Sequence, residues 1–289
     1  MTMPFYVPAE QMMKDKADFA RKNIARGKAL VAMLYADGIL ICAENTSSTL
    51  RKVSEIYDRI AFAGAGKYNE YDRLRIAGVR HADLKGYSFS REDVDAQSLA
   101  NAYAQMLSDV FTHEIKPMEV EIVVAELGVD PSGDGLFHIF YDGTVVDEKD
   151  FTVLGGGEAD AIADRVKQTY EPGRPLDAAL RAAVAALAGD RPLSSDDLEI
   201  AVLSRDNGRR AFRRLSAEEV DAALAGGSGG PTADDSGAGA GGQAGTGAGE
   251  VPGPADETAT ATPEGADPSE ASDASEAPDA GSGEGERGG

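Results

Sequence analysis

Residues 28–43, with the sequence KALVAMLYADGILICA, decide the fold of this chain. Two apolar runs, Ala29–Tyr35 and Ile39–Ala43, flank the dipeptide Asp37-Gly38. This dipeptide readily adopts the positive backbone angles of a tight hairpin turn. The stretch therefore predicts two adjacent antiparallel strands.

The same hairpin signal occurs twice more along the chain. Leu136–Tyr141 and Thr144–Val146 flank Asp142-Gly143, and Leu198–Ser204 and Arg210–Arg214 flank a turn at 206–208. Three further apolar segments indicate strands: Arg59–Ala65, Val120–Glu126 and Phe151–Leu154. Strands that arrive as hairpins predict antiparallel sheets.

Helices are predicted in the intervals between these strand groups. The first, Ala9–Ala25, follows Pro8 and places Met13, Ala17, Ala20 and Ile24 on one face. The others are expected at Asn69–Val79, Val94–His113, Glu158–Tyr170 and Leu176–Leu187. Because they come in pairs between strand groups, we expect helices on the outer faces of two sheets, an α+β four-layer α/β/β/α sandwich. The competing fold, a doubly wound parallel sheet, would require strict alternation of strands and helices, which this sequence lacks.

Composition divides the chain into a folded part and a tail. Residues 226–289 contain no Phe, Tyr, Leu, Ile or Met, but 18 glycines, 13 acidic residues and one basic residue. Such a segment cannot bury enough apolar surface to offset its ordering entropy, which predicts a disordered acidic Gly/Ala-rich tail. We therefore expect an N-terminal segment 1–8, a sandwich domain 9–225 and a tail 226–289.

Charge and hydropathy exclude several classes of function. The net charge is −22 and no Lys/Arg stripe alternates with aromatic residues, so nucleic acid is not an expected partner. Charged residues interrupt the N-terminal 21 residues, and no apolar run approaches the length of a membrane span. We expect a cytoplasmic protein without membrane contact. The single cysteine, Cys42, lies in an apolar run and is interpreted as a core residue.

Motif searches identify no catalytic or metal site and no cofactor. The segment Gly64–Lys67 lacks the first glycine and the Ser/Thr of a phosphate-binding loop, which favours tight strand-to-helix packing. Gly155–Gly157 is interpreted as a plain turn. His81, His113 and His138 fall in different elements without metal-ligand spacing, and no serine or cysteine has a nearby base in the sequence.

Several separated segments nevertheless match a known family in order. They are the helix 9–26, the strand 28–35 with its Asp37-Gly38 turn, RKVSEIYD at 51–58, AFAGAG at 61–66, YAQML at 103–107, EVEI at 119–122, YDG at 141–143 and RRAFRR at 209–214. Over about residues 3–216 the chain resembles the α-subunits of the 20S proteasome, of actinobacterial type. The tail matches only in being acidic and of low complexity.

The resemblance implies the fold of the N-terminal-nucleophile hydrolases without their activity. In catalytic β-subunits a processed threonine begins the first strand and its amine acts as the base. Here Gly27, Lys28 and Ala29 occupy that place. Glu44 and Lys52 lie where active subunits carry an acid and a lysine, but without the nucleophile they cannot cleave a peptide.

The resemblance also implies partners and two sites. A heptameric ring of α-subunits would stack on β-subunits, admit unfolded substrates and dock a ring-shaped ATPase that delivers tagged proteins, or other activators. The gate would consist of Thr2, Met3, Pro4, Phe5, Tyr6, Val7 and Pro8. The other interpretation of this segment is a frayed terminus without a role. Lys52 would receive an activator's C-terminal carboxylate, unless it is a solvated surface lysine beside Arg51 and Glu55.

Two other functions remain open at this stage. Removal of Met1 would expose Thr2 as the nucleophile of an independent amidohydrolase, although a helix separates Thr2 from the first strand. A generic acidic binding module is the third hypothesis.

Overall fold

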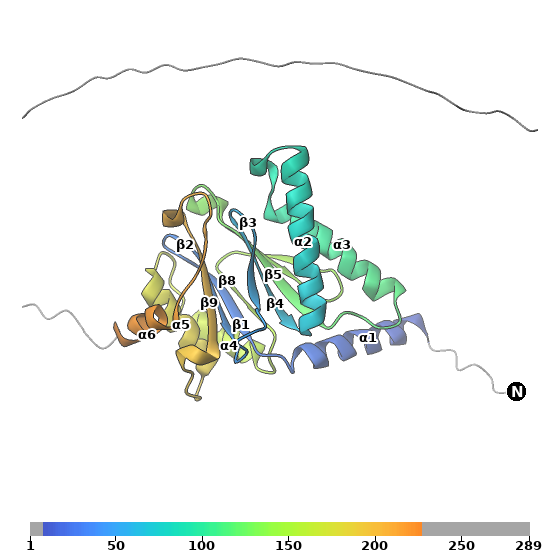
Figure 1. Ribbon diagram of the computed structural model, residues 1–289. Coiled ribbons are helices and arrows are strands. Elements are labelled where there is room, and N and C mark those ends of the chain that lie inside the picture. Colours follow the sequence, from blue (N-terminus) through green and yellow to red (C-terminus); the bar gives the residue numbers. More distant parts are fainter. Residues whose placement is uncertain (1–7, 227–289) are drawn as a thin grey trace, which may run out of the picture. The chain divides into compact units, whose positions relative to one another are not determined.

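The computed structural model describes residues 8–226, and over these residues two antiparallel sheets stack face to face between two layers of helices (Figure 1). Every strand pair in this region is antiparallel. The predicted α/β/β/α sandwich is confirmed, and the parallel doubly wound alternative is wrong. The gate residues Thr2–Val7 and the predicted tail, apart from Gly226, lie outside the described residues.

Sheet A contains the hairpin on which the fold prediction was based. Its strand order is β10-β9-β2-β1-β8, with Tyr35 opposite Gly38 at the turn. A Cβ on Gly38 would lie 1.9 Å from the backbone oxygen of Leu203, so the neighbouring strand requires glycine there. The strands are β1 (Leu30–Tyr35), β2 (Gly38–Glu44), β8 (Phe151–Leu154), β9 (Leu198–Ser204) and β10 (Phe212–Arg214).

Sheet B has the order β3-β4-β5-β6-β7, so its strands follow the chain. The short segment between β7 and β8 carries the chain from sheet B to sheet A, and these two strands form sheet edges on the same side of the sandwich. The strands are β3 (Val53–Tyr57), β4 (Ile60–Gly66), β5 (Val120–Glu126), β6 (Gly135–Ile139) and β7 (Val145–Glu148).

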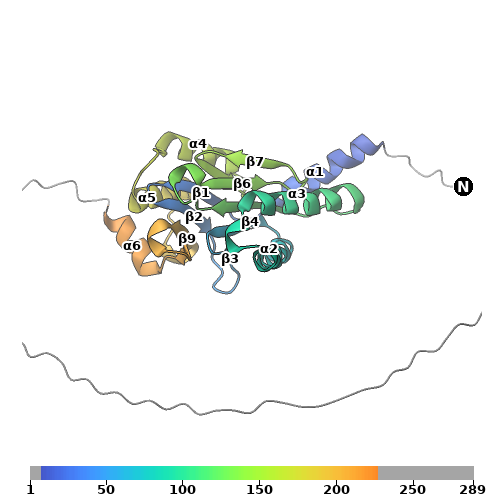
Figure 2. The same cartoon turned by 90° about the horizontal axis from the view of Figure 1, so that it is seen from above.

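Helices cover both outer faces. Helices α2 and α3 lie on sheet B, and α4 and α5 lie on sheet A, with α6 packed against α5 (Figures 1 and 2). The helices are α1 (Ala9–Ile24), α2 (Tyr68–Ser88), α3 (Ala96–His113), α4 (Ala159–Thr169), α5 (Leu176–Ala188) and α6 (Ala217–Ala225). Within residues 8–226, four short 3-10 helices lie at Arg91–Asp93, Pro131–Gly133, Ser195–Asp197 and Arg205–Asn207.

Alternation along the strands divides the interior into three apolar layers. In β1, Leu30 and Ala32 face sheet B, whereas Val31 and Met33 face α4 and α5. Because both faces of the strand are buried, its sequence is a continuous apolar run rather than an alternating one. On the far side, Phe62 of β4 packs against Tyr103 of α3, with ring centroids 5.8 Å apart.

Helix α1 stays attached in front of β1 and packs against the side of the sandwich. Its buried Ala20 and Ile24 contact Tyr141 and Phe111. The Lys16 ammonium donates to the backbone oxygens of Phe111, at 2.9 Å, and of Glu114. These contacts hold α1 next to the end of α3.

Three elements differ from the sequence prediction. Strand β3 was not predicted, because Ser54 and Glu55 interrupt its apolar pattern at a sheet edge. Helix α6 was also missed, although Ser216 and Glu219 form a capping box that the sequence carries. Helix α2 continues nine residues beyond the predicted end at Val79, because Ala82 still packs in the core.

Gly78 provides a test of the packing between α2 and α3. Alanine normally stabilises a helix interior by about 1 kcal/mol relative to glycine. Here a Cβ at Gly78 would lie 1.7 Å from the Tyr103 hydroxyl. We predict that Gly78→Ala lowers the free energy of unfolding by about 1–3 kcal/mol in urea denaturation.

Tyr103→Phe is the matched companion variant, because its buried hydroxyl has no hydrogen-bond partner among the described residues. We expect this variant alone to be neutral or stabilising, and to recover part of the loss in the double variant. A Gly78→Ala chain as stable as the original would contradict the close contact.

Candidate functional site

A cluster of charged residues lies where β1 begins, β2 ends and β3 begins. Lys28 precedes β1, Glu44 ends β2 and Lys52 precedes β3. The hairpin register holds the first two together, because the Glu44 amide donates to the backbone oxygen of Ala29 at 3.0 Å. The structure therefore brings together the three residues that the resemblance assigned to the acid, the lysine and the vacated nucleophile position.

Glu44 is the buried acid of this cluster, with 4% of its surface exposed. Its Oε1 accepts a hydrogen bond from Lys28 Nζ at 2.5 Å, and Arg191 donates to both carboxylate oxygens at 3.2 Å. Burial alone would raise the pKa of Glu44, but Arg191 and Lys28 together hold that pKa below its ordinary value. Glu44 is therefore a fixed negative charge rather than a proton carrier.

Lys52 is buried, with 8% of its surface exposed. Its ammonium donates to the backbone oxygen of Lys28 and, at 3.4 Å, to that of Glu44. Burial lowers the pKa of Lys52 to about 8, although the carboxylates of Glu199 and Glu44 oppose this shift. The interpretation of Lys52 as a solvated surface lysine is wrong, and Glu55 instead pairs with Arg210 at 2.6 Å.

Glu199 of β9 fixes the backbone around Lys52. Its Oε2 accepts from the Lys52 amide at 2.8 Å and from Asn45 Nδ2 at 2.8 Å. Its Oε1 accepts from the Val53 amide at 3.3 Å and from Arg214 Nη1 at 2.5 Å. One buried carboxylate thus joins the loop after β2, the start of β3 and strand β10.

Sequence reasoning missed Glu199, Arg191 and Arg214. Glu199 carried a usable signal, because alternation along Leu198–Ser204 places an acid on the face that Ala201 and Leu203 direct toward the other sheet. A charge on an interior face must be paired. Arg214 lies on β10, the hairpin partner of β9, whereas Arg191 comes from the segment after α5, and only the folded chain brings both to the cluster.

Two cavities border the charged cluster. One, of about 330 Å³, is lined by Lys28, Glu44, Arg191 and the turn before α4. The other, of about 410 Å³, is lined by the loop 45–48, Arg51 and Glu199. Lys52 lines neither cavity, so a ligand would reach its ammonium only after displacing a neighbouring group.

The cluster holds charge but carries no nucleophile at the strand start. Lys28 and Ala29 stand there, and the amide of the preceding Gly27 donates to Ile24 at the end of α1 at 2.9 Å. The chain is therefore continuous through the position where a free amine would serve as base. Of the predicted gate residues only Pro8 is described, as the exposed residue that immediately precedes α1.

The glycine segments serve packing and turns. A Cβ on Gly64 would lie 2.7 Å from the Tyr71 ring, and one on Gly66 would lie 2.1 Å from the backbone oxygen of Glu119. The packing interpretation of Gly64–Lys67 is confirmed. Gly155 and Gly156 have φ values of 67° and 78° in the turn before α4. Within residues 8–226, no group of three or more His, Cys, Asp or Glu side chains is arranged to hold a metal ion.

Comparison with known proteins identifies the family. The model of the family described as "Proteasome subunit" matches residues 24–203. The chain belongs to the proteasome subunit family. It is 60% identical over 225 residues to a protein named "Proteasome subunit alpha" from Acidimicrobium ferrooxidans, covering 78% of this chain and 97% of that one.

Two more actinobacterial relatives carry the same name. One from Thermomonospora curvata is 53% identical over 228 residues, and one from Kineococcus radiotolerans is 52% identical over 236 residues. Each alignment covers 78% of this chain and 99% of the relative. Within the family the chain is of the actinobacterial α type, the non-catalytic ring subunit, and the catalytic threonine resides on β-subunits. Among the described helices, none is long and apolar enough to cross a membrane.

Proposed function

We propose that this chain forms the heptameric outer ring of a cytoplasmic proteasome core, stacks on β-subunits, gates the entry of unfolded substrates and docks activators. The observation that carries the proposal is the lysine at the strand start. The chain keeps the scaffold of a nucleophile hydrolase. At the position before β1, where such a hydrolase would carry its nucleophile, it has Lys28, whose ammonium donates a hydrogen bond to Glu44. A subunit that keeps this scaffold but lacks a nucleophile contributes to proteolysis by assembling the particle and by controlling the entry of substrates.

The first experiment separates a scaffold from an independent hydrolase. We predict that the isolated chain hydrolyses no fluorogenic peptide, whereas particles formed by co-expression with a β-subunit do. Mass spectrometry of the mature N-terminus reports whether Met1 is removed and Thr2 exposed. Peptide turnover by the isolated chain that disappears in a Thr2→Ala variant would establish the amidohydrolase instead.

The gate proposal concerns residues 1–8. Met1, Met3, Phe5, Tyr6 and Val7 are apolar, and the segment leads directly into α1 at Pro8. Seven apolar segments brought together at a ring axis would exclude water and polypeptide without any catalytic group. The gate therefore consists, in this proposal, of Thr2, Met3, Pro4, Phe5, Tyr6, Val7 and Pro8.

Deleting residues 2–7 tests the gate. We predict that assembled particles with this deletion hydrolyse peptides of about ten residues severalfold faster, because passage of longer chains limits their rate. Hydrolysis of a tripeptide substrate serves as the control and should change little. Equal rates on the long peptide would favour a terminus without a gating role.

The docking proposal concerns Lys52. Its ammonium is held by two backbone oxygens, and a carboxylate is a stronger partner because the hydrogen bond then joins two opposite charges. Glu44 is already neutralised by Lys28 and Arg191, which limits its repulsion of an incoming carboxylate. An activator's C-terminus that displaced the neighbouring groups would thus meet a buried positive charge at low local dielectric.

We predict that Lys52→Ala weakens activator binding at least tenfold, because an unpaired buried carboxylate costs about 2–5 kcal/mol. Lys22→Ala, which removes an exposed lysine of α1, is the matched control and should bind normally.

Because the pKa of Lys52 is about 8 in the free site and a bound carboxylate favours the ammonium, the affinity for the activator should fall as the pH rises through 8. Surface plasmon resonance on assembled particles measures the activator affinity of each variant and its dependence on pH. An unchanged affinity in the Lys52→Ala variant would contradict the docking site.

A further inference from the structure

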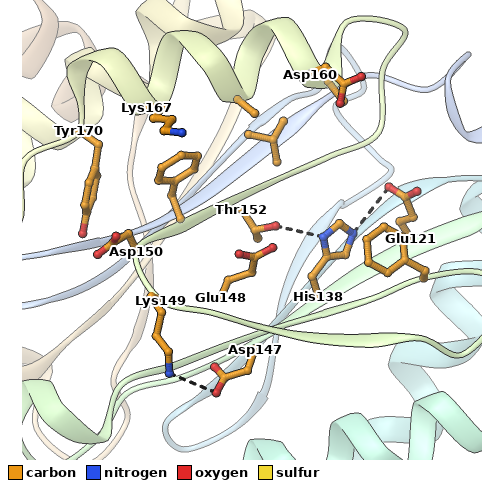
Figure 3. A pocket seen from close by; sticks show the side chains of 15 residues that line it. Glu121, His138, Asp147, Glu148, Lys149, Asp150, Thr152, Asp160, Lys167 and Tyr170 are labelled. Carbon is orange, nitrogen blue, oxygen red and sulfur yellow. Dashed lines mark hydrogen bonds and ion pairs between the residues drawn. The ribbon is translucent and has the colours of Figure 1, made fainter.

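Among the described residues, two hollows differ in the kind of occupant that they suit. The larger, of about 730 Å³, is bordered by β7, β8 and α4 and is lined by five carboxylates and two lysines (Figure 3). Nε2 of its buried His138 lies 3.7 Å from Glu121 Oε2. An uncharged apolar group placed there would take these charges out of water without pairing them, which is costly. The second hollow, of about 560 Å³, is mainly apolar.

The second hollow is a groove between α1 and the end of α3 with its connection to β5 (Figure 1). Three large apolar side chains line it and are exposed: Met12 by 45%, Phe19 by 45% and Ile115 by 95%. Exposed apolar side chains that gather in one place mark a binding surface, whereas scattered single ones do not. We name this surface the α1 groove.

Helix spacing explains why apolar surface is left open here. Met12, Lys16 and Phe19 are four and three residues apart, so they share one face of α1. Farther along the helix, Ala20 and Ile24 are buried in the contact with the sandwich, whereas Met12 and Phe19 remain half exposed. The N-terminal half of α1 therefore has an apolar face that the described residues do not fully cover.

The positive charges of the α1 groove already have partners. Lys16 donates to two backbone oxygens. The Lys116 ammonium lies 2.9 Å from Glu70 Oε1 and 2.5 Å from Glu119 Oε1, and it lies 6.0 Å from the centre of the Phe19 ring. An occupant of the groove therefore needs apolar surface rather than a negative charge.

The chain itself carries an apolar segment beside the groove. Residues 1–7, MTMPFYV, have no charged side chain, and they end at Pro8, about one helical turn before Met12. Prolines at positions 4 and 8 favour an extended backbone at the residues that precede them. In an extended segment alternate side chains share a face. One such face would consist of apolar residues alone: Met1, Met3, Phe5 and Val7.

The length of this segment matches the groove. An extended chain advances about 3.4 Å per residue, whereas an α-helix rises about 1.5 Å per residue. A segment that turned back at Pro8 would place Phe5 about midway between Met12 and Phe19, and Met3 about level with Phe19. The alternate apolar side chains would then follow the exposed apolar face of α1.

We infer that residues 1–7 fold back along α1 of their own chain and bind in the α1 groove through this apolar face. The inference rests on the gate proposed above and names the surface that holds each gate segment when the gate is open. In the groove the apolar side chains are covered by their own chain. They are then not available to meet the other six segments at the ring axis.

Disulfide trapping in particles formed with a β-subunit tests the contact. We expect a chain with Met3→Cys and Phe19→Cys to form, on mild oxidation, a disulfide within one chain in more than about half of the copies. Non-reducing gel electrophoresis and intact mass measure the yield. The native Cys42 is buried and takes no part. The control pair, Met3→Cys with Val129→Cys, should give at least tenfold less, because Val129 is exposed but lies beyond the far end of β5.

Polar substitutions in the groove test whether apolar contact drives the trapping. Adding Met12→Gln and Ile115→Gln to the Met3–Phe19 pair should reduce the disulfide yield at least fivefold, since both side chains are exposed and their change should leave the fold intact. Adding Ile76→Gln instead, which changes an exposed residue of α2, is the matched control and should leave the yield unchanged. Equal yields in the two variants would overturn the apolar contact.

The trapped particles also report the state of the gate. We expect oxidation of the Met3–Phe19 pair to raise hydrolysis of a peptide of about ten residues severalfold, to the rate of particles that lack residues 2–7. Reduction with dithiothreitol should reverse this gain. Slower hydrolysis after oxidation would overturn the assignment of the groove to the open gate.

Failure of the groove contact and failure of the gate give different results. A disulfide that joins two chains, or a yield no greater than that of the Val129 control, would overturn the contact within one chain. If the deletion of residues 2–7 still speeds hydrolysis, the gate proposal stands without the groove. A disulfide within one chain together with no effect of the deletion would keep the contact and overturn the gate.

Discussion

The rest of the structure depends on the burial of both faces of two sheets. The layer between the sheets is rich in alanine, with Ala32, Ala63 and Ala201 among its buried residues. Small side chains let the sheets approach closely, and helices on both outer faces complete the burial. Since strands in such a core offer few places for a charge, the ionisable side chains gather where strands begin and end.

The charged cluster at these strand ends follows from that constraint. Glu44 and Glu199 are buried at the margin of the inner layer and each has at least one arginine partner, Arg191 and Arg214. Removing a partner would leave a buried charge uncompensated, which is strongly destabilising. The cluster therefore holds the start of β1, the end of β2 and the start of β3 in one arrangement. It thereby maintains a framework around Lys52.

Much of the fold was predictable from local sequence. The Asp-Gly turns and the apolar runs gave the hairpins β1–β2 and β6–β7, and the paired helices gave the layers. Strand β3 was not predictable by the same means, because Ser54 and Glu55 belong to an edge whose stability comes from pairing with β4. Of the site, Glu44 and Lys52 were predicted through the family resemblance, whereas the burial of Lys52 and its carbonyl partners required the folded chain.

The sequence by itself determined the hairpins, the four-layer class and the absence of a nucleophile before β1, because these depend on residue type and spacing along a short segment. Only the tertiary structure decided which distant charges meet. Arg191 reaches Glu44 across 147 positions, and Arg210 reaches Glu55 across 155. No periodicity encodes such pairs, because the packing of α5 on sheet A sets the first distance and the stacking of the two sheets sets the second.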